Sequence, residues 1–174
     1  MERNNFRTFL RMHYQLIGVL IAAFLVLAST GTYTNWDSQL EFEAASGVVT
    51  RGFPFLSTGL MINQPPLGFY LDAPAFQTFG LSYTVGVSFI TAFGLGSIAL
   101  VYALGTLLYG KKTGLVAAAI FGITPWQVFM SRIFLIDVQC LFLSLLYLLV
   151  GILAVRRNSE KLVLVAGVVF GVKG

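Results

Sequence analysis

The sequence predicts an all-α polytopic membrane protein with about five transmembrane helices. Hydrophobic residues make up 57% of its 174 residues, and the mean hydropathy is +0.83. Charged residues make up 10%, against about 25% in an average soluble domain. The apolar residues also gather into runs that reach or approach the roughly 20 residues needed to cross a bilayer. A soluble domain of this length could not bury so much apolar surface.

The composition excludes several other classes of protein. The single cysteine, Cys140, cannot form an internal disulfide. The single histidine, His13, argues against a Cys/His zinc site and against a Ser-His-Asp triad. The net charge of +4 does not indicate a nucleic-acid partner, because the basic residues lie in short flanks beside apolar runs, where they set the orientation in the membrane.

Five apolar segments are expected to enter the membrane. They are residues 14–30, 83–109, 113–130, 133–155 and 162–174. We interpret the first as a retained signal anchor and not a cleaved signal peptide, because further spans follow it. The third is short and is expected to end in a bent segment near Pro125. The fifth covers only roughly 20 Å at about 1.5 Å per residue, so residues 1–174 are expected to be the N-terminal portion of a longer transmembrane domain.

The charges predict the orientation. If the spans alternate, eight basic residues fall on one side, which the positive-inside rule makes cytoplasmic. These eight are Arg3, Arg7, Arg11, Lys111, Lys112, Arg156, Arg157 and Lys161. The opposite side holds only Arg51 and Arg132, with five of the seven carboxylates. The sequence therefore predicts a cytoplasmic N-terminus and an outer loop over residues 31–82.

This outer loop is too apolar to be a solvated linker, and two helices are expected to lie on the membrane surface within it. Residues 37–50 form the first, which ends at Gly52. Its apolar positions repeat at i, i+4 and i+8 on one face, at Leu40, Ala44 and Val48. Residues 69–79 are the second. Together with a short outer loop over residues 126–137, they are expected to form a roof over the helix bundle.

Asp37, just outside the first span, is the first candidate for chemistry. It is either a solvated surface carboxylate or a general base beside a pocket of low polarity, where burial would raise its pKa towards a useful value. Glu41 lies one helical turn further and could share its face, whereas Glu43 points elsewhere and is expected to be solvated.

Arg132 and Asp137 are the candidates in the short outer loop. An ionisable residue such as Asp137 at the end of an apolar span is a functional candidate by default, and its alternative is a structural pair with Arg51 or Arg132. Arg132 suits a phosphate, because guanidinium is always charged and offers a fork of donors. Lys173 is the one lysine deep in an apolar run, and its alternative role is to extend its ammonium to the interface.

A series of short motifs follows these candidates along the chain. They are Asn35-Trp-Asp37 with Glu41, Gly52-Phe-Pro-Phe55, Asn63-Gln-Pro-Pro-Leu-Gly-Phe-Tyr70, Tyr109-Gly-Lys-Lys-Thr-Gly114, Thr124-Pro-Trp126, Ser131-Arg132 with Asp137, and Gly171-Val-Lys173. In this order, and over almost the whole chain, they resemble the N-terminal part of the GT-C membrane glycosyltransferases. The group they resemble contains the dolichyl-phosphate-mannose protein mannosyltransferases and the aminoarabinose lipid A transferases.

The resemblance implies a reaction and roles for particular residues. Such enzymes take a sugar from a polyprenyl phosphate and pass it to a protein, lipid or glycan acceptor outside the cytoplasm, with inversion. Asp37 would be the base, while Ser38 stands where the family usually has Glu. Gln64 stands where the family usually has Lys, so Arg132 and Lys173 would carry most of the donor phosphate binding. No cofactor is certain, and a divalent metal on Asp37 and Asp137 is possible.

Two other classes of function stay open from the sequence. One is a non-catalytic membrane subunit or half-enzyme, which would need the remaining helices of a longer chain or a partner subunit. The other is a small transporter or lipid carrier, which is disfavoured because the spans hold almost no charge. The expected location is the plasma membrane, or the endoplasmic reticulum membrane in a eukaryote. The expected partners are the bilayer, a lipid-linked sugar and its acceptor.

Overall fold

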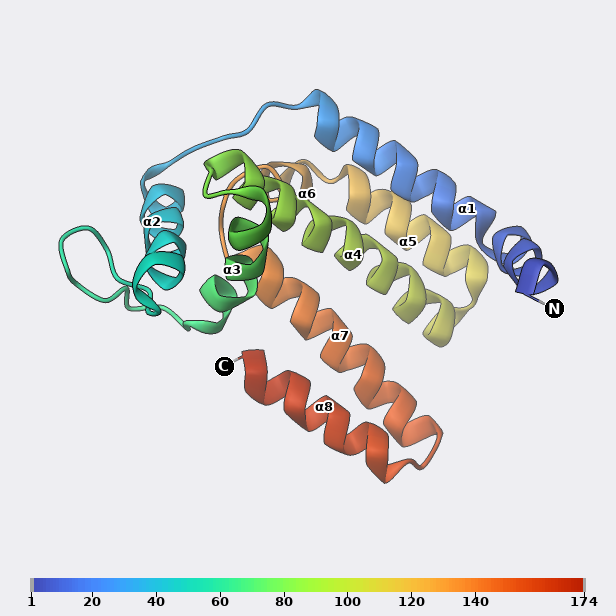
Figure 1. Ribbon diagram of the computed structural model, residues 1–174. Helices are drawn as coiled ribbons and strands as arrows, with labels where there is room; N and C mark the ends of the chain where they lie inside the picture. Colours follow the sequence, from blue (N-terminus) through green and yellow to red (C-terminus); the bar gives the residue numbers. More distant parts are fainter. Residues whose placement is uncertain (1, 174) are drawn as a thin grey trace.

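A computed structural model describes the backbone of residues 2–173 and the side chains of residues 14–171. This part of the chain folds into eight α-helices, and its only β-structure is two isolated bridges (Figure 1). In chain order the helices are α1 (Glu2–Ser29), α2 (Trp36–Arg51), α3 (Leu67–Phe79), α4 (Tyr83–Tyr109), α5 (Lys111–Ile123), α6 (Pro125–Met130), α7 (Asp137–Arg156) and α8 (Glu160–Lys173). The prediction of an all-α protein is confirmed.

Within the described residues, two helices are long and apolar enough to cross a membrane. These are α4, with 27 residues, and α7, with 20. Only 17% of the most apolar window of α7 is buried, and most of its other apolar side chains are partly exposed. The other predicted spans correspond to shorter apolar segments, namely residues Tyr14–Ser29 of α1, α5 and α8. Two spans are therefore supported by length and composition, and five stay a prediction.

Two predicted spans have different bounds in the structure. The segment expected over residues 113–130 is broken into α5 and α6 at Thr124, whose backbone is extended, with φ −60° and ψ 125°. Pro125 causes the break, because the residue before a proline avoids the helical region, and proline then suits the first position of a new helix. The span expected to begin at residue 133 begins at Asp137, since residues 133–136 are held outside the helix.

Helices α1, α4 and α5 pack together around a small apolar core (Figure 1). Its buried members are Ala23, Ile98, Tyr102 and Ala118. Glycines bring the backbones of α4 and α5 close together, because a Cβ on Gly105 would lie 2.7 Å from the Cα of Gly114. Near the C-terminal ends of α4 and α7, Arg156 of α7 donates a hydrogen bond to the carbonyl of Leu107 at 2.8 Å.

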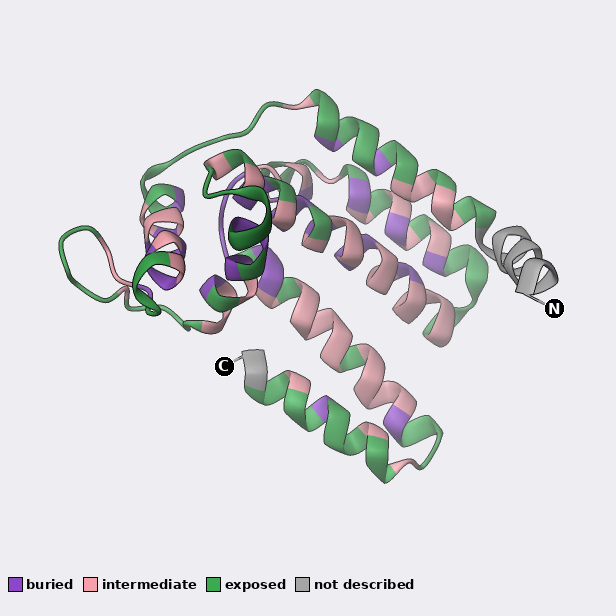
Figure 2. Ribbon diagram, in the orientation of Figure 1, coloured by how far each residue is buried: buried purple, intermediate pink, exposed green. Residues whose placement is uncertain are grey.

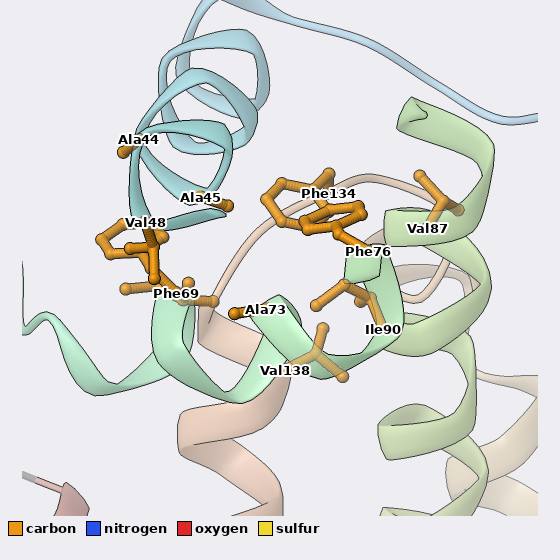
Figure 3. Close-up of a cluster of buried hydrophobic side chains, with 11 residues drawn as sticks. Ala44, Ala45, Val48, Phe69, Ala73, Phe76, Val87, Ile90, Phe134 and Val138 are labelled. Carbon is orange, nitrogen blue, oxygen red and sulfur yellow. The ribbon is translucent and has the colours of Figure 1, made fainter. Parts of the chain in front are cut away.

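Helices α2 and α3 and residues 131–136 form a layer across one end of α4 and α7, which we call the roof (Figure 1). The α4–α5 and α7–α8 turns lie at the other end of the molecule. The two helices predicted in the outer loop are confirmed, with α2 ending at Gly52 in a left-handed conformation at φ 83°. The roof has its own core, in which Phe134 lies beside Phe76 (Figure 3).

Burial follows this division of the molecule. The buried residues gather in the roof and along the contacts of α1, α4 and α5, whereas α8 is mostly exposed (Figure 2). Helix α8 packs against α7 and makes its main contact there. The roof and its contact with α7 therefore enclose several polar side chains in packed protein, among them Ser38, Glu41, Asp72 and Gln139.

Candidate active site

Asp37 lies in the first turn of α2, where its charge also stabilises the helix N-terminus. A capping box fixes this turn, because Asn35 accepts a hydrogen bond from the Ser38 N–H at 2.8 Å and the Asn35 N–H donates to the Ser38 hydroxyl at 2.9 Å. The Asp37 side chain is exposed. A substrate can therefore reach the carboxylate from outside the roof.

Ser38 also has a structural role in the roof. Its side chain is fully buried, and its hydroxyl lies 3.1 Å from the hydroxyl of Tyr83 on α4. A glutamate, the residue expected here from the resemblance, would bring a longer and charged side chain into this fully buried position. The position after Asp37 thus anchors α2 to α4 and leaves Asp37 as the carboxylate at the helix start.

Residues 131–136 of the roof are not helical, and residues on other elements form hydrogen bonds with their backbone groups. The Tyr33 N–H donates to the Arg132 carbonyl at 2.9 Å, and the Phe134 N–H donates to the Tyr83 hydroxyl at 3.2 Å. The Thr91 hydroxyl donates to the Ser131 carbonyl at 2.7 Å. Irregular backbone at the edge of a membrane is tolerated where protein groups satisfy it in this way.

The ring of Phe134 anchors the middle of this segment. It lies edge-on to Phe42 of α2, with ring centroids 5.7 Å apart, and packs beside Phe76 of α3 and Tyr83 of α4. Gly86 makes room for the ring, because a Cβ there would lie 2.6 Å from it. The position of the segment is therefore set by a packed aromatic cluster as well as by hydrogen bonds.

Arg132 is partly buried, and its guanidinium points back into the bundle. One terminal nitrogen donates to the carbonyl of Thr30 at 3.0 Å, and the other lies 3.5 Å from the Thr91 hydroxyl. The Nε–H is buried without a hydrogen-bond partner among the described residues. This donor is enclosed by protein, so an anion that binds Arg132 would meet the terminal nitrogens of the guanidinium. Its bonds go to neutral oxygens, and the alternative of a pair with Asp137 gains no support.

Glu41 lies at the centre of the roof and is only 2% exposed. Its carboxylate accepts a hydrogen bond from the Ile136 N–H at 2.8 Å. Burial raises the pKa of Glu41 to about 7, while the bonds from Ile136 and the Gln64 amide lower it. The negative charges of Asp137 and Asp37 raise this pKa further. Asp37, Gln64 and Asp137, three other predicted site residues, therefore all act on the ionisation of Glu41.

The comparisons with known proteins bear on this arrangement. The family model described as dolichyl-phosphate-mannose-protein mannosyltransferase matches residues 63–173. The chain belongs to this mannosyltransferase family. Membership confirms the GT-C resemblance drawn from the sequence and implies a membrane glycosyltransferase in general terms. A search of curated proteins and a search of solved structures found no match.

The region that matches the mannosyltransferase family also contains two candidate site residues that the sequence analysis did not single out. Asp72 of α3 is fully buried and accepts a hydrogen bond from the Gln139 amide of α7. Burial raises the pKa of Asp72 to about 8, the bond from Gln139 lowers it, and the charge of Glu41 raises it. The available signal was a carboxylate and an amide, each inside an apolar helix.

Asp137 is exposed and is the first residue of α7, whereas Arg132 lies in the non-helical segment before it. It lines a cavity of about 280 Å³ together with Trp126 and Gln127. No group of three or more metal-ligating side chains occurs among residues 14–171. A metal held by Asp37 and Asp137 therefore gains no support from the described part of this mannosyltransferase-family chain.

The two remaining phosphate candidates have different outcomes. Gln64 is exposed and has its hydrogen bond to Glu41, so its contacts connect it to the roof carboxyl and not to Arg132. The side chain of Lys173 lies outside the described residues. Of the two charged phosphate candidates, Arg132 is thus the one whose side chain the structure describes.

Proposed function

We propose that the chain belongs to a membrane glycosyltransferase that transfers a sugar from a polyprenyl-phosphate donor to an extracytoplasmic acceptor with inversion. The observation that carries this proposal is the joining of the Asp37 helix to the Arg132 segment through Glu41 and the Phe134 cluster. An accessible carboxylate and a partly buried guanidinium are held on one packed roof within a chain of the mannosyltransferase family.

The proposed reaction needs one base and one anion-binding group. Asp37 takes the proton from an acceptor hydroxyl as its oxygen attacks the anomeric carbon of the donor sugar. The bond between that carbon and the phosphate oxygen breaks on the opposite face, so the configuration inverts. The lipid leaves as a polyprenyl monophosphate, which needs no proton to depart, and Arg132 stabilises the charge that develops on it.

Two features of the described chain support a lipid donor. Helix α7 begins at the roof and continues as an apolar span in which few residues are fully buried. Between α3 and α4 there is also an apolar cavity of about 410 Å³, lined by residues such as Phe79, Val85 and Phe89. A lipid phosphate at the roof could therefore extend its chain along apolar helix surfaces.

The test is sugar transfer by membranes that carry the full-length protein. Radiolabelled polyprenyl-phosphate mannose is supplied to these membranes and to matched membranes carrying the Asp37→Asn variant. The proposal expects label in a lipid or protein product, with an anomeric configuration opposite to that of the donor. Equal label with the Asp37→Asn variant, or retained configuration, would contradict it. A donor that is never consumed would favour the alternative of a non-catalytic subunit.

A further inference from the structure

Three parts of the candidate site meet at one side chain. Asp37 lies one turn before Glu41 on α2, Gln64 bonds to the Glu41 carboxyl, and the Ile136 N–H donates to that carboxyl at 2.8 Å. Ile136 directly precedes Asp137, the first residue of α7. A single carboxyl therefore joins α2 to the Gln64 segment and to the start of α7.

Other anchors hold different parts of the roof. Residues 131 and 134 are bound to α4 through Thr91 and Tyr83, and the Arg132 guanidinium is bound to Thr30 and Thr91. Among the hydrogen bonds of residues 131–136 in the described chain, the one from Ile136 ends on an α2 side chain. The start of α7 thus depends on Glu41 for its polar link to the helix that carries Asp37.

Sequence and burial indicate that this link is more than a surface contact. Glu41 is 2% exposed and is surrounded by the apolar core of the roof. A carboxyl in such a place costs stability unless it is bonded, and an apolar residue of similar size would pack there at lower cost. Packing alone does not explain why a carboxyl is buried at this position. Its bonds to the Gln64 segment and to Ile136 indicate that it connects these two segments to α2.

We propose that Glu41 is a positioning residue, which fixes the start of α7 and the Gln64 segment relative to Asp37. Its kinetic consequence rests on the proposed function, but its geometric consequence does not. With the link in place, the base on α2 and the Arg132 segment face one substrate in a constant geometry. Without it, Arg132 keeps its own bonds while α2 can shift, and small misplacements of reacting groups lower turnover strongly.

The chain supplies a matched control for this residue. Glu43 lies on the same helix, and its carboxylate also accepts one backbone N–H, from Ser57 at 2.7 Å. Ser57 is not itself a candidate site residue, although it lies in the same α2–α3 loop as Gln64. Glu41→Leu and Glu43→Leu thus make the same chemical change on the same helix, and Glu41→Gln keeps an acceptor for the Ile136 N–H.

The geometric test uses spin labels on the full-length protein, with Cys140 replaced by Ser. Labels at Gln39 and Leu141, both exposed, report the distance between α2 and α7. We expect a narrow distance distribution in the parent protein, in Glu41→Gln and in Glu43→Leu, and a broadened or shifted one in Glu41→Leu. An unchanged distribution in folded Glu41→Leu would overturn the proposal.

The kinetic test uses polyprenyl-phosphate mannose as the donor. We expect kcat of Glu41→Leu to fall ten- to a hundredfold, with the donor KM changed less than threefold, because Arg132 keeps its bonds. Glu41→Gln should recover most of kcat, and Glu43→Leu should stay within twofold of the parent. Normal turnover in Glu41→Leu would overturn positioning while the proposed function stands. If the parent transfers no sugar, the proposed function fails, and the distance measurement still decides the role of Glu41.

Discussion

Glu41 accepts a hydrogen bond at 2.8 Å from the N–H of Ile136, a residue 95 positions later in the chain. This contact joins the helix of Asp37 to the start of the helix of Asp137. It also places a titratable group, whose pKa burial raises to about 7, at the centre of a packed layer. The stability of the roof should therefore depend on pH.

The first prediction concerns this dependence. The pKa of Glu41 is raised from 4.5 to about 7, so the folded protein binds the proton more tightly than the unfolded chain does. The resulting stabilisation is complete below pH 4.5, falls as the pH rises and is lost above about pH 7. One pKa unit corresponds to about 1.4 kcal/mol, so the loss is on the order of a few kcal/mol.

The measurement is the thermal midpoint in detergent between pH 5 and pH 8. The parent protein should lose stability across this range more steeply than Glu41→Gln, which has no proton to lose. Asp72, whose pKa is raised to about 8, adds a similar dependence that remains in this variant. Parallel curves for the parent and Glu41→Gln would show that the Glu41 carboxyl titrates near its ordinary value.

The second prediction concerns the base. Asp37→Asn keeps the size of the side chain but cannot take a proton, and general base catalysis contributes roughly 100- to 10,000-fold. Turnover of the full-length protein should fall by about that factor, with donor binding hardly changed, and Glu43→Gln serves as the control. If Asp37→Asn turns over normally, Asp37 is not the base, and Glu41 or Asp137 becomes the next candidate.

The third prediction concerns the phosphate. Arg132→Ala removes a charged hydrogen bond worth about 1.5–3 kcal/mol, so donor affinity should weaken roughly ten- to a hundredfold. Arg51→Ala is the matched control, because Arg51 is also predicted to lie outside but is exposed, and its hydrogen bond among the described residues goes to the Leu56 carbonyl at 3.4 Å. Affinity is measured with the donor lipid on folded protein. Equal affinity in the two variants would assign Arg132 a purely structural role in holding Thr30.

The fourth prediction concerns orientation. Ser57 and Thr113 are exposed, and the predicted topology places them on opposite sides of the membrane. In a background without Cys140, an impermeant thiol reagent should label Ser57→Cys on intact cells and Thr113→Cys only after permeabilisation. The reverse pattern would invert the orientation and remove the extracytoplasmic site.

The sequence predicted the helices of the outer loop closely, because their start and stop signals are local. Asn35 and Ser38 cap α2, and Gly52 ends it. The start of α7 was predicted four residues early, since residues 133–136 are as apolar as the span that follows. These four residues are apolar because they are buried in the roof, and hydrophobicity alone does not separate burial in protein from burial in lipid.

The candidate site was predicted in part. The sequence singled out Asp37, Glu41 and Arg132, but it could not show that Glu41 is the buried member of the group. Nor did it indicate the bond between Asp72 and Gln139, because that contact joins α3 to α7 across 67 residues. Long-range pairing of this kind depends on how the helices pack, and no local pattern in a single sequence reports it.

The bonds that tie residues 131–136 to residues 30–91 reach backwards along the chain, over 40 to 102 positions. During synthesis, Thr30, Glu41, Tyr83 and Thr91 have left the ribosome before this segment emerges. Closing such long loops adds an entropic cost that grows only slowly with length. The roof is therefore completed when the start of α7 arrives and docks on partners that are already made. Substitutions at these four partners should leave membrane insertion normal but prevent the start of α7 from docking. Insertion of the protein and assembly of its site are therefore separate steps.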